Sequence, residues 1–254
     1  MGQDLAPELG GGVSAPLLSV RNVSRRFGGL TAVDSVSFDI AQGELVSIVG
    51  PNGAGKTTLF NLLTGQLKPS SGEIDFDGHD IGPLQSHQRA RLGLGRTFQI
   101  SQTLTSLTTL ENAMIGAFLH RPSLREAARH AQDILDLVGL GARAHVRSQI
   151  LTLSERRRLE MARALALDPK IVLLDEVMAG LNPTETEEIV TLVKSLHSKG
   201  FTFIVIEHNL KVVRQVAQRV IVLDRGAKLA EGGADEVLAN PAVVEAYIGK
   251  GKRL

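Results

Sequence analysis

The chain has 254 residues, 43% hydrophobic and 22% charged, which is the ordinary composition of a soluble globular protein. Its 28 lysines and arginines nearly balance its 27 aspartates and glutamates, so no global field favours nucleic acid or an anionic membrane as a partner. Cysteine is absent, which excludes a disulfide framework and thiolate chemistry. No apolar run reaches the length of a spanning helix and the start lacks a signal-peptide pattern, so we expect a cytosolic protein.

The N-terminal third of the sequence begins with a predicted tail and two predicted strands. Residues 1–16 contain three consecutive glycines and two prolines, which favour a flexible tail. Residues 17–23 and 33–40 carry apolar residues with a period near two, which predicts strands. Phe27 falls on a predicted turn between them. Its ring could stack on an adenine base, but the residues alone favour a core phenylalanine.

A glycine-rich stretch, Gly50–Thr58, organises the rest of the chain. It follows the apolar run Leu45–Val49 and leads into a helical segment, which is the setting expected for the pattern G-x-x-x-x-G-K-[ST]. Glycines allow such a backbone to approach a ligand closely, and its amides converge on an anion at the helix N-terminus. Lys56 can reach β- and γ-phosphates, and the Thr57 hydroxyl can ligate Mg²⁺. A nucleotide site is therefore predicted; a glycine turn with a chance lysine is the weaker alternative.

The middle of the chain changes from strands to helices. Residues 73–78 alternate as an exposed antiparallel strand does. Residues 110–118 and 124–138 have helical spacing instead, so we predict a mostly helical insertion from about 101 to 150. Three histidines of this insertion share no metal-ligand spacing and are expected on solvated helix faces: His120, His130 and His145.

Another helix is predicted after Leu151. Ser154 is a plausible N-cap for it, and Glu155 suits the positive end of a helix. The three arginines at 156–158 could indicate nucleic acid. Because no aromatic residues interleave with them to stack on bases, we expect a solvated or subunit-facing helix surface instead.

Two later apolar runs end in residues that can do chemistry. The run from Ile171 ends at Asp175 and Glu176, and the run from Phe201 ends just before Glu207 and His208. Unbroken apolar runs suit central parallel strands, whose carboxyl ends hold the ligand in open α/β sheets. Asp175 is placed to hold Mg²⁺ and Glu176 to act as general base on water. His208 is a candidate γ-phosphate sensor; an acidic turn and a structural histidine are the alternatives.

The start of the helix between these two runs is also predictable. Asn182 as N-cap, Pro183 at the first helical position and Glu185 at the third give a strong start signal. Strands near 220–223 and 228–231 and helices over 234–248 would complete an α/β core.

These motifs, in this order, resemble those of the nucleotide-binding subunit of an ABC transporter, and the resemblance runs from about Leu17 to the end. It implies an α/β fold, a P-loop NTPase (RecA-like) core with an antiparallel β subdomain and a helical insertion subdomain. Beyond the tail over 1–16, a single ATPase domain would span 17–254. Its α/β core would comprise 17–100 and 164–254, and its helical subdomain, with the signature motif, about 101–163.

The resemblance also implies roles for individual residues and the cofactors ATP and Mg²⁺. The implied catalytic residues are Glu176, His208 and Lys56, and the implied metal ligands are Thr57, Gln99 and Asp175. Gln99 matches the Q-loop, which in the family senses Mg²⁺ and couples to the membrane subunit. The signature residues, which would act on the nucleotide of a second subunit, are Thr152, Ser154 and Glu155. The implied nucleotide contacts are Phe27, Val33, Gly50, Pro51, Asn52, Gly53, Ala54, Gly55, Lys56, Thr57, Thr58 and Gln99.

The signature departs from the family pattern L-S-x-G-[QE] at one important position. Ser154 replaces a glycine that, in the family, lies against the γ-phosphate held by the other subunit and leaves little room for a Cβ. Val177, where proline commonly follows the glutamate, is a milder departure. We therefore hypothesise an asymmetric pair of sites, formed with a different ATP-binding partner. A tight ATP-bound dimer of this chain alone would contradict that hypothesis.

Within the family, the chain is most similar to the ATP-binding subunits of branched-chain (hydrophobic) amino acid importers. The similarity lies in residues 27–33, 95–99, 179–183 and 243–249. Urea, short-chain amide and aromatic-acid importers use similar subunits and stay open as alternatives. So does a regulatory ABC subunit that hardly hydrolyses. A soluble ABC ATPase acting on nucleic acid usually carries two such domains or a long coiled coil, and this chain has neither.

The resemblance finally implies partners and a location. These are transmembrane permease subunits, a second ATP-binding subunit and, indirectly, a solute-binding protein; no nucleic acid is expected. The subunit would sit peripherally on the cytoplasmic face of the inner membrane, held there by the permease. A groove near Gln99 and the helical insertion would receive a helix of the permease.

Overall fold

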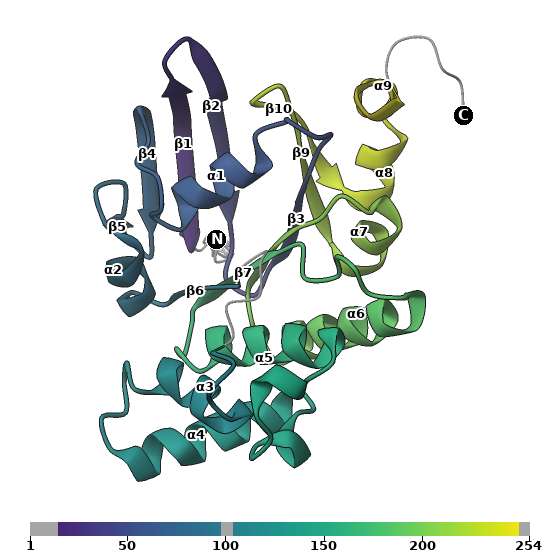
Figure 1. Cartoon of the computed structure of the whole chain (residues 1–254). Coiled ribbons are helices and arrows are strands. Elements are labelled where there is room, and N and C mark those ends of the chain that lie inside the picture. The colour runs from purple at the N-terminus through teal and green to yellow at the C-terminus, as the bar shows by residue number, and fades with distance from the viewer. Residues whose placement is uncertain (1–14, 98–103, 249–254) are drawn as a thin grey trace, which may run out of the picture.

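The computed structural model of the chain describes residues 15–97 and 104–248, and its strands form two sheets (Figure 1). One is a four-stranded antiparallel sheet in the order β2-β1-β4-β5, and the other has six strands in the order β10-β9-β3-β8-β7-β6. In the larger sheet only β10 runs antiparallel to its neighbour. The strands are β1 Leu18–Phe27, β2 Leu30–Ile40, β3 Leu45–Val49, β4 Ser71–Phe76, β5 His79–Asp80, β6 Leu94–Arg96, β7 Ile171–Asp175, β8 Phe203–Ile206, β9 Arg219–Asp224 and β10 Ala227–Gly233. The predicted fold class is confirmed.

Helices flank the larger sheet and fill the connection between β6 and β7. They are α1 Lys56–Leu63, α2 Ser86–Arg91, α3 Thr109–Ala117, α4 Leu124–Leu137, α5 Leu153–Leu165, α6 Pro183–Ser198, α7 Leu210–Val216, α8 Ala234–Ala239 and α9 Pro241–Ile248, with short 3₁₀ turns η1 Gly141–Arg143 and η2 Ser148–Ile150. Within the described ranges no helix combines the length and apolarity needed to cross a bilayer.

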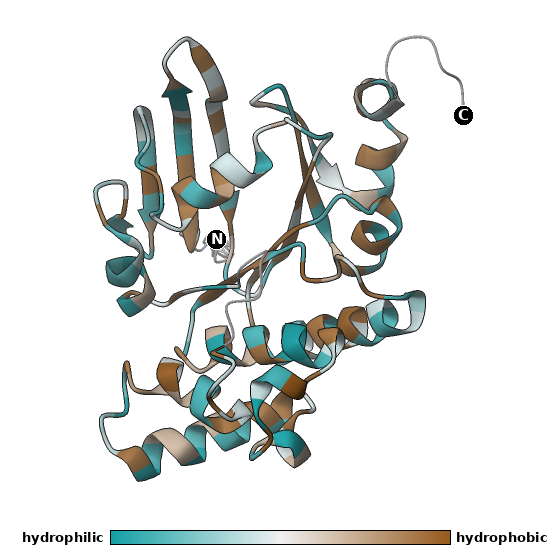
Figure 2. Cartoon of the chain, in the orientation of Figure 1, coloured by the Kyte–Doolittle hydropathy of each residue, from teal (hydrophilic) through white to brown (hydrophobic). Residues whose placement is uncertain are grey.

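The central strands are buried along their whole length because both faces of the sheet are covered. Every residue of β3, β7 and β8 is buried, and Figure 2 shows these strands as hydrophobic. Their parallel pairing, in which Val46 lies opposite Ile204 and Leu174 opposite Val205, brings their carboxyl ends to one edge of the sheet. The glycine-rich loop Gly50–Thr58, named the phosphate loop after its predicted ligand, therefore meets Asp175 and His208 at that edge, as predicted from the apolar runs.

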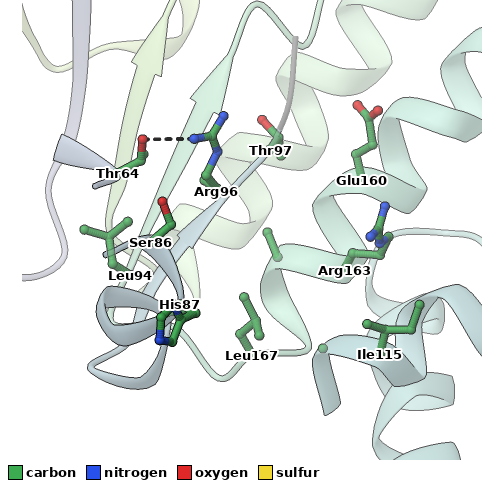
Figure 3. Close-up of a pocket in the computed structure, with 13 residues that line it drawn as sticks. Thr64, Ser86, His87, Leu94, Arg96, Thr97, Ile115, Glu160, Arg163 and Leu167 are labelled. Atoms are coloured by element: carbon green, nitrogen blue, oxygen red, sulfur yellow. Dashed lines mark hydrogen bonds between the residues drawn. The ribbon is translucent and has the colours of Figure 1, made fainter. Parts of the chain in front are cut away.

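A groove of about 280 Å³ lies between α2 and β6 on one side and α3 and α5 on the other (Figure 3). Its apolar lining includes Leu94 of β6, Ile115 of α3 and Leu167 after α5, whereas Glu160 and Arg163 of α5 line its polar part. Arg96 at the end of β6 donates a hydrogen bond of 2.9 Å to the Thr64 hydroxyl. The groove thus lies beside the end of β6.

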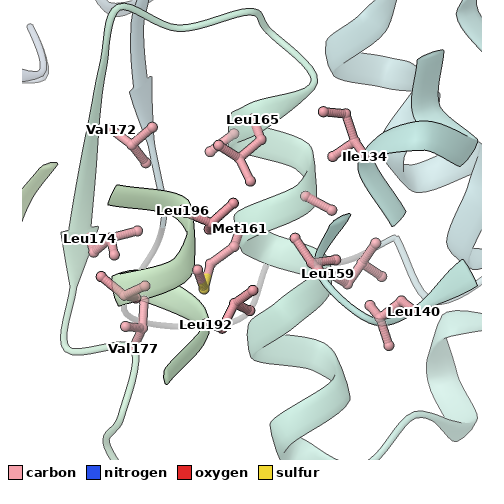
Figure 4. Packing of buried hydrophobic residues seen from close by; sticks show 14 of the residues in the cluster. Ile134, Leu140, Leu159, Met161, Leu165, Val172, Leu174, Val177, Leu192 and Leu196 are labelled. Atoms are coloured by element: carbon pink, nitrogen blue, oxygen red, sulfur yellow. The ribbon is translucent and has the colours of Figure 1, made fainter. Parts of the chain in front are cut away.

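One hydrophobic cluster joins the helical segment to the sheet (Figure 4). Helix α5 lies at its centre: Leu159, Met161 and Leu165 are at most 1% exposed and share the cluster with Ile134 of α4 and Leu174 of β7. Burying such side chains is worth roughly 1.5–3 kcal/mol each. The helical segment therefore rests on the sheet chiefly through α5.

The start of α5 differs from the prediction. Thr152, and not Ser154, is the N-cap: its hydroxyl accepts from the Glu155 amide, and the Glu155 carboxylate accepts from the Thr152 amide at 2.9 Å. The spacing Thr-x-x-Glu is a capping box, which satisfies two amides reciprocally and so wins over a cap at Ser154. At α6 the predicted box of Asn182 and Glu185 with Pro183 is confirmed.

Two charged groups are also less exposed than predicted. Arg157 is only 7% exposed and donates to Glu160 at 3.2 Å, so it belongs to the interior, whereas a solvated or subunit-facing surface was predicted for all three arginines. His130 is half-buried and its Nε2 lies 3.1 Å from the Asp168 carboxylate. Packing of α4 and α5 against their neighbours, which helical spacing alone does not reveal, explains both differences.

Candidate functional site

The phosphate loop needs glycine at its first and last glycine positions. A Cβ on Gly50 would lie 2.2 Å from the Leu223 carbonyl oxygen, and one on Gly55 would lie 2.4 Å from that of Ala32. Gly55 also has φ of +98°, which favours glycine, and it stands immediately before α1. The loop is thus wedged between β9 and β2, and its backbone approaches both without side chains between them.

The loop forms one wall of a cleft of about 630 Å³. Glu176 also lines it, so the structure brings together two motifs that are more than a hundred residues apart in the sequence. The remaining walls come from the start of β2 and the turn between β9 and β10. The lining residues are Leu30, Thr31, Ala32, Asn52, Gly53, Ala54, Gly55, Lys56, Thr57, Thr58, Glu176, Arg225 and Gly226.

Some of these residues were not predicted, and some predicted ones lie elsewhere. Thr31 and Arg225 were missed because sheet order, which has no local sequence signal, brings them to the cleft. The Gly226 amide donates to the Ala54 carbonyl at 3.0 Å, which ties that turn to the loop. Val33 is fully buried in the smaller sheet and is absent from the lining. Gln99 lies outside the described residues.

Lys56 is held inside its own loop. Its ammonium donates to the carbonyl of Gly50 at 2.6 Å and to that of Pro51 at 3.0 Å, and the residue is 8% exposed. Burial lowers the pKa of Lys56, whereas the negative charges of Glu176 and Asp175 act in the opposite direction. The lysine is therefore a nearly buried cation within the loop that is predicted to bind phosphate.

Asp175 ends β7 beside the end of β8, and Glu176 follows it directly. Burial, with the neighbouring Glu176 charge, raises the pKa of Asp175 to about 6, although Arg96 opposes the rise. The Nδ1 atom of His208 lies 3.5 Å from the Glu176 carboxylate. A buried carboxylate and the Thr57 hydroxyl are oxygen donors of the kind that Mg²⁺ takes together with water and phosphate oxygens. Among the described residues, no group of three or more acidic, histidine or cysteine side chains could hold a metal without such help.

Glu207 is a buried acid that the sequence motifs did not single out. It is 1% exposed, and one carboxylate oxygen accepts from the Met178 amide at 3.4 Å. Burial raises the pKa of Glu207 to about 7. Glu207, which directly precedes His208, is thus hydrogen-bonded to the segment that follows Glu176.

Comparison with known proteins decides the family. Residues 33–179 match the profile described as ABC transporter, and 227–253 match that described as Branched-chain amino acid ATP-binding cassette transporter. The chain belongs to the ABC transporter family. The BraF branched-chain amino acid transport ATP-binding protein of Pseudomonas aeruginosa is 38% identical over 94% of this chain and its own whole length. LivG of Escherichia coli K12 is 39% identical with the same coverage.

Solved structures agree with this assignment to the ABC family. An ATP-binding cassette of an ABC transporter in its ADP conformation has a TM-score of 0.84 and 33% identity, and covers 92% of this chain and 99% of its own. A dimeric cassette bound to ADP and Pi, in a post-hydrolysis state, has a TM-score of 0.76 and 30% identity over 85% of this chain and 98% of its own. The chain is therefore an ABC-type ATPase.

Phe27 lies at the end of β1 in this ABC cassette, two residues beyond the predicted turn's start. The strand continues through Arg25 and Arg26 because they pair with β2. The Phe27 ring is exposed, at 42%, which excludes the core interpretation, and the Arg25 guanidinium lies 4.7 Å from the ring centroid. Stacking of this ring on adenine stays a prediction.

The ABC signature residues lie apart from the cleft. Thr152, Ser154 and Glu155 form the first turn of α5, and none of them lines the cleft that contains Lys56 and Glu176. Ser154 is 7% exposed. The residues predicted as the signature therefore do not belong to the cleft of their own chain.

Proposed function

We propose that this chain is the ATPase subunit of an importer for branched-chain amino acids, with MgATP bound in the cleft of the phosphate loop. The observation that carries the proposal is the cleft itself, which unites Lys56 with Glu176 and places His208 3.5 Å from that carboxylate. The transported solute rests on the relatives, which are branched-chain amino acid transport ATP-binding proteins, and on the matching C-terminal profile.

The proposed mechanism assigns each described group one task. The amides of the loop and the Lys56 ammonium hold the phosphates, which requires Lys56 to leave the carbonyls of Gly50 and Pro51. Glu176 accepts a proton from the attacking water, and His208 orients toward the γ-phosphate. Thr57 and Asp175 would hold Mg²⁺, and that ion would contribute positive charge at the phosphate oxygens.

The proposed assembly is two ATP-binding subunits head to tail, each presenting its signature to the other's nucleotide. Closure by ATP and reopening after product release would drive the transport cycle through differential binding. Permease subunits would hold the pair at the cytoplasmic face of the membrane. The groove between β6 and α3 offers an apolar floor and charged edges to a helix of the permease.

The test is uptake in the native cell. Deletion of the gene should abolish energised uptake of labelled leucine, and the wild-type gene should restore it whereas Glu176→Gln should not. Urea, a short-chain amide and phenylalanine are measured in parallel. Loss of one of these in place of leucine uptake would assign the subunit to that alternative importer. Restoration by Glu176→Gln would favour a regulatory subunit.

A further inference from the structure

The turn between β9 and β10 carries an arginine in an unusual backbone conformation. Arg225 and Gly226 form this two-residue turn, with φ of +47° and +85°. The flanking residues, Asp224 and Ala227, pair with each other across the hairpin. Positive φ at both turn positions is the pattern of a type I′ turn, which prefers Asn or Asp before Gly because their short side chains tolerate the left-handed region. Local backbone preference therefore does not explain the arginine.

A second two-residue turn of the chain follows the usual preference. Asp77 and Gly78 join β4 to β5 with φ of +52° and +76°, and neither lines the cleft of the phosphate loop. Among the described residues, the left-handed non-glycine residues with short polar side chains are Asn22, Ser35, Asp77 and Asp168. The two with long side chains are Glu176 and Arg225, and both line the cleft. Because backbone strain of this kind concentrates at ligand sites, the side chain of Arg225 is the reason to look for a role.

The backbone of this turn is held against two walls of the cleft. The Gly226 amide donates to the Ala54 carbonyl of the phosphate loop at 3.0 Å, and the Gly226 carbonyl accepts from the Asp34 amide of β2 at 2.8 Å. A Cβ on Gly226 would lie 3.0 Å from the Ala32 carbonyl oxygen, so the turn also packs closely on the start of β2. Arg225 thus projects from a fixed position between the phosphate loop and β2.

The guanidinium of Arg225 is available to a ligand. Its side chain is 92% exposed, and its Nε lies 3.9 Å from the Asp224 carboxylate, at the outer limit of an ion pair. Within the described ranges, no hydrogen bond engages the guanidinium. Two parallel N–H donors of an arginine match two oxygens of a phosphate. An exposed arginine on the wall of a cleft that is proposed to bind ATP therefore has the chemistry to contact the phosphates.

We propose that Arg225 is a nucleotide-binding residue whose guanidinium donates to the α- and β-phosphates from the side of β2. This inference rests on the proposed assignment of Gly50–Thr58 as the phosphate site. Glu176 is assigned to the water that attacks the γ-phosphate, whereas the turn of Arg225 adjoins the start of β2, which follows the predicted adenine-stacking residue Phe27. Arg225 thus faces the part of the nucleotide that ATP and ADP share, and both should gain the contact.

The test measures Kd by calorimetry on the full-length chain, for the magnesium complexes of ADP and of a non-hydrolysable ATP analogue. Arg225→Asn removes the cation and introduces a residue that the turn prefers. Kd should therefore rise about 5- to 20-fold for both nucleotides, and the melting temperature of the unliganded protein should not fall. The difference from wild type should shrink at high salt, which screens an exposed charge.

Two further variants complete the test. Arg125→Gln removes the same charge from an exposed position of α4 and should leave both Kd values unchanged. Lys56→Ala should weaken binding strongly, and wild-type affinity in that variant would refute the phosphate site itself.

The inference is overturned separately from the phosphate site. If Lys56→Ala weakens binding but Arg225→Asn binds both nucleotides as wild type does, the guanidinium has no role. An equal loss of affinity in Arg125→Gln would reduce the effect to net charge. A lower melting temperature of Arg225→Asn together with weaker binding would attribute the loss to the turn itself. Weaker binding of the ATP analogue alone would place Arg225 at the γ-phosphate and contradict the proposed contact.

Discussion

The imidazole of His208 and the carboxylate of Glu176 face each other at 3.5 Å across the ends of two neighbouring strands, β8 and β7. Each follows a buried apolar strand, and the parallel register of those strands sets their distance. Two groups able to act on one water and one phosphate are therefore already adjacent in the single chain. In the proposed mechanism, the second subunit therefore only adds its own contacts to the nucleotide and does not bring His208 and Glu176 together.

Replacing Glu176 by Gln should reduce ATP hydrolysis about 100-fold or more, because the amide cannot accept the proton of water. ATP affinity should stay near the wild-type value, since the loop and Lys56 are untouched. Phosphate release and nucleotide affinity are measured on the chain purified with its partner subunits. Glu187→Gln, at an exposed position of α6, is the matched control and should hydrolyse normally. Unchanged turnover in Glu176→Gln would remove this residue from the proposed mechanism.

Ser154 should prevent this chain from closing on a second copy of itself. We expect Glu176→Gln to remain a monomer with MgATP when its mass is measured by light scattering. Glu176→Gln combined with Ser154→Gly should shift to a dimer, because the Cβ and hydroxyl no longer occupy the start of α5. Adding Lys56→Ala should abolish that shift. A dimer formed by Glu176→Gln alone would contradict the asymmetric pair.

Glu207 should make the protein less stable as pH rises. Its pKa is raised from 4.5 to about 7, so the folded state binds more protons than the unfolded state between these values. Stability is then greatest below pH 4.5 for this group and declines through pH 7. Glu207→Gln cannot titrate, so it should match wild type near pH 4 and exceed it by about 3 kcal/mol at pH 8.

The measurement for Glu207 is unfolding by denaturant at a series of pH values. Glu236→Gln, at an exposed position of α8, should follow the wild-type curve. Parallel curves for wild type and Glu207→Gln would show that Glu207 keeps an ordinary carboxyl pKa in the folded protein.

Arg89 should be a major source of stability for the helix after the phosphate loop. It is fully buried and donates to the carbonyls of Leu62 and Leu63 at the end of α1, at 2.6 and 2.8 Å. It also donates to two carbonyls beyond α1, those of Gly82 and Leu84. Arg89→Met removes all these hydrogen bonds and should cost about 3 kcal/mol or more. Arg91→Ala, exposed on the same helix, should change the free energy of unfolding by less than about 0.5 kcal/mol.

Local sequence patterns predicted the individual strands and helix starts better than they predicted which of these elements lie next to one another. The apolar run at 45–49 gives β3 with the predicted bounds, the run at 171–176 gives β7 one residue shorter, and the capping box at Asn182 is where it was expected. Signals of this kind lie within a few residues of each other. The walls of the cleft formed by Thr31 and Arg225 depend instead on the strand order of a folded sheet.

The burial of individual charged residues was the other property that the periodicity of apolar residues did not predict. Arg157 stands among polar residues in the sequence, yet it lies inside because Glu160 and the Ala179 carbonyl accept from it. Glu207 likewise carries no motif of its own, and only the contact with Met178 shows that it joins two functional segments. Such pairings arise from tertiary packing, which overrides the preference of an isolated charged residue for water.

The helical segment leaves the sheet from β6 and returns to it through β7, and these two strands are hydrogen-bonded neighbours. The backbone therefore connects the helical segment to the sheet at two neighbouring strands, at one edge of the sheet. A displacement of these helices is transmitted through the backbone to β6 and β7 before any other strand. Because β7 ends at Asp175, its backbone leads directly from the helical segment to Asp175 and Glu176.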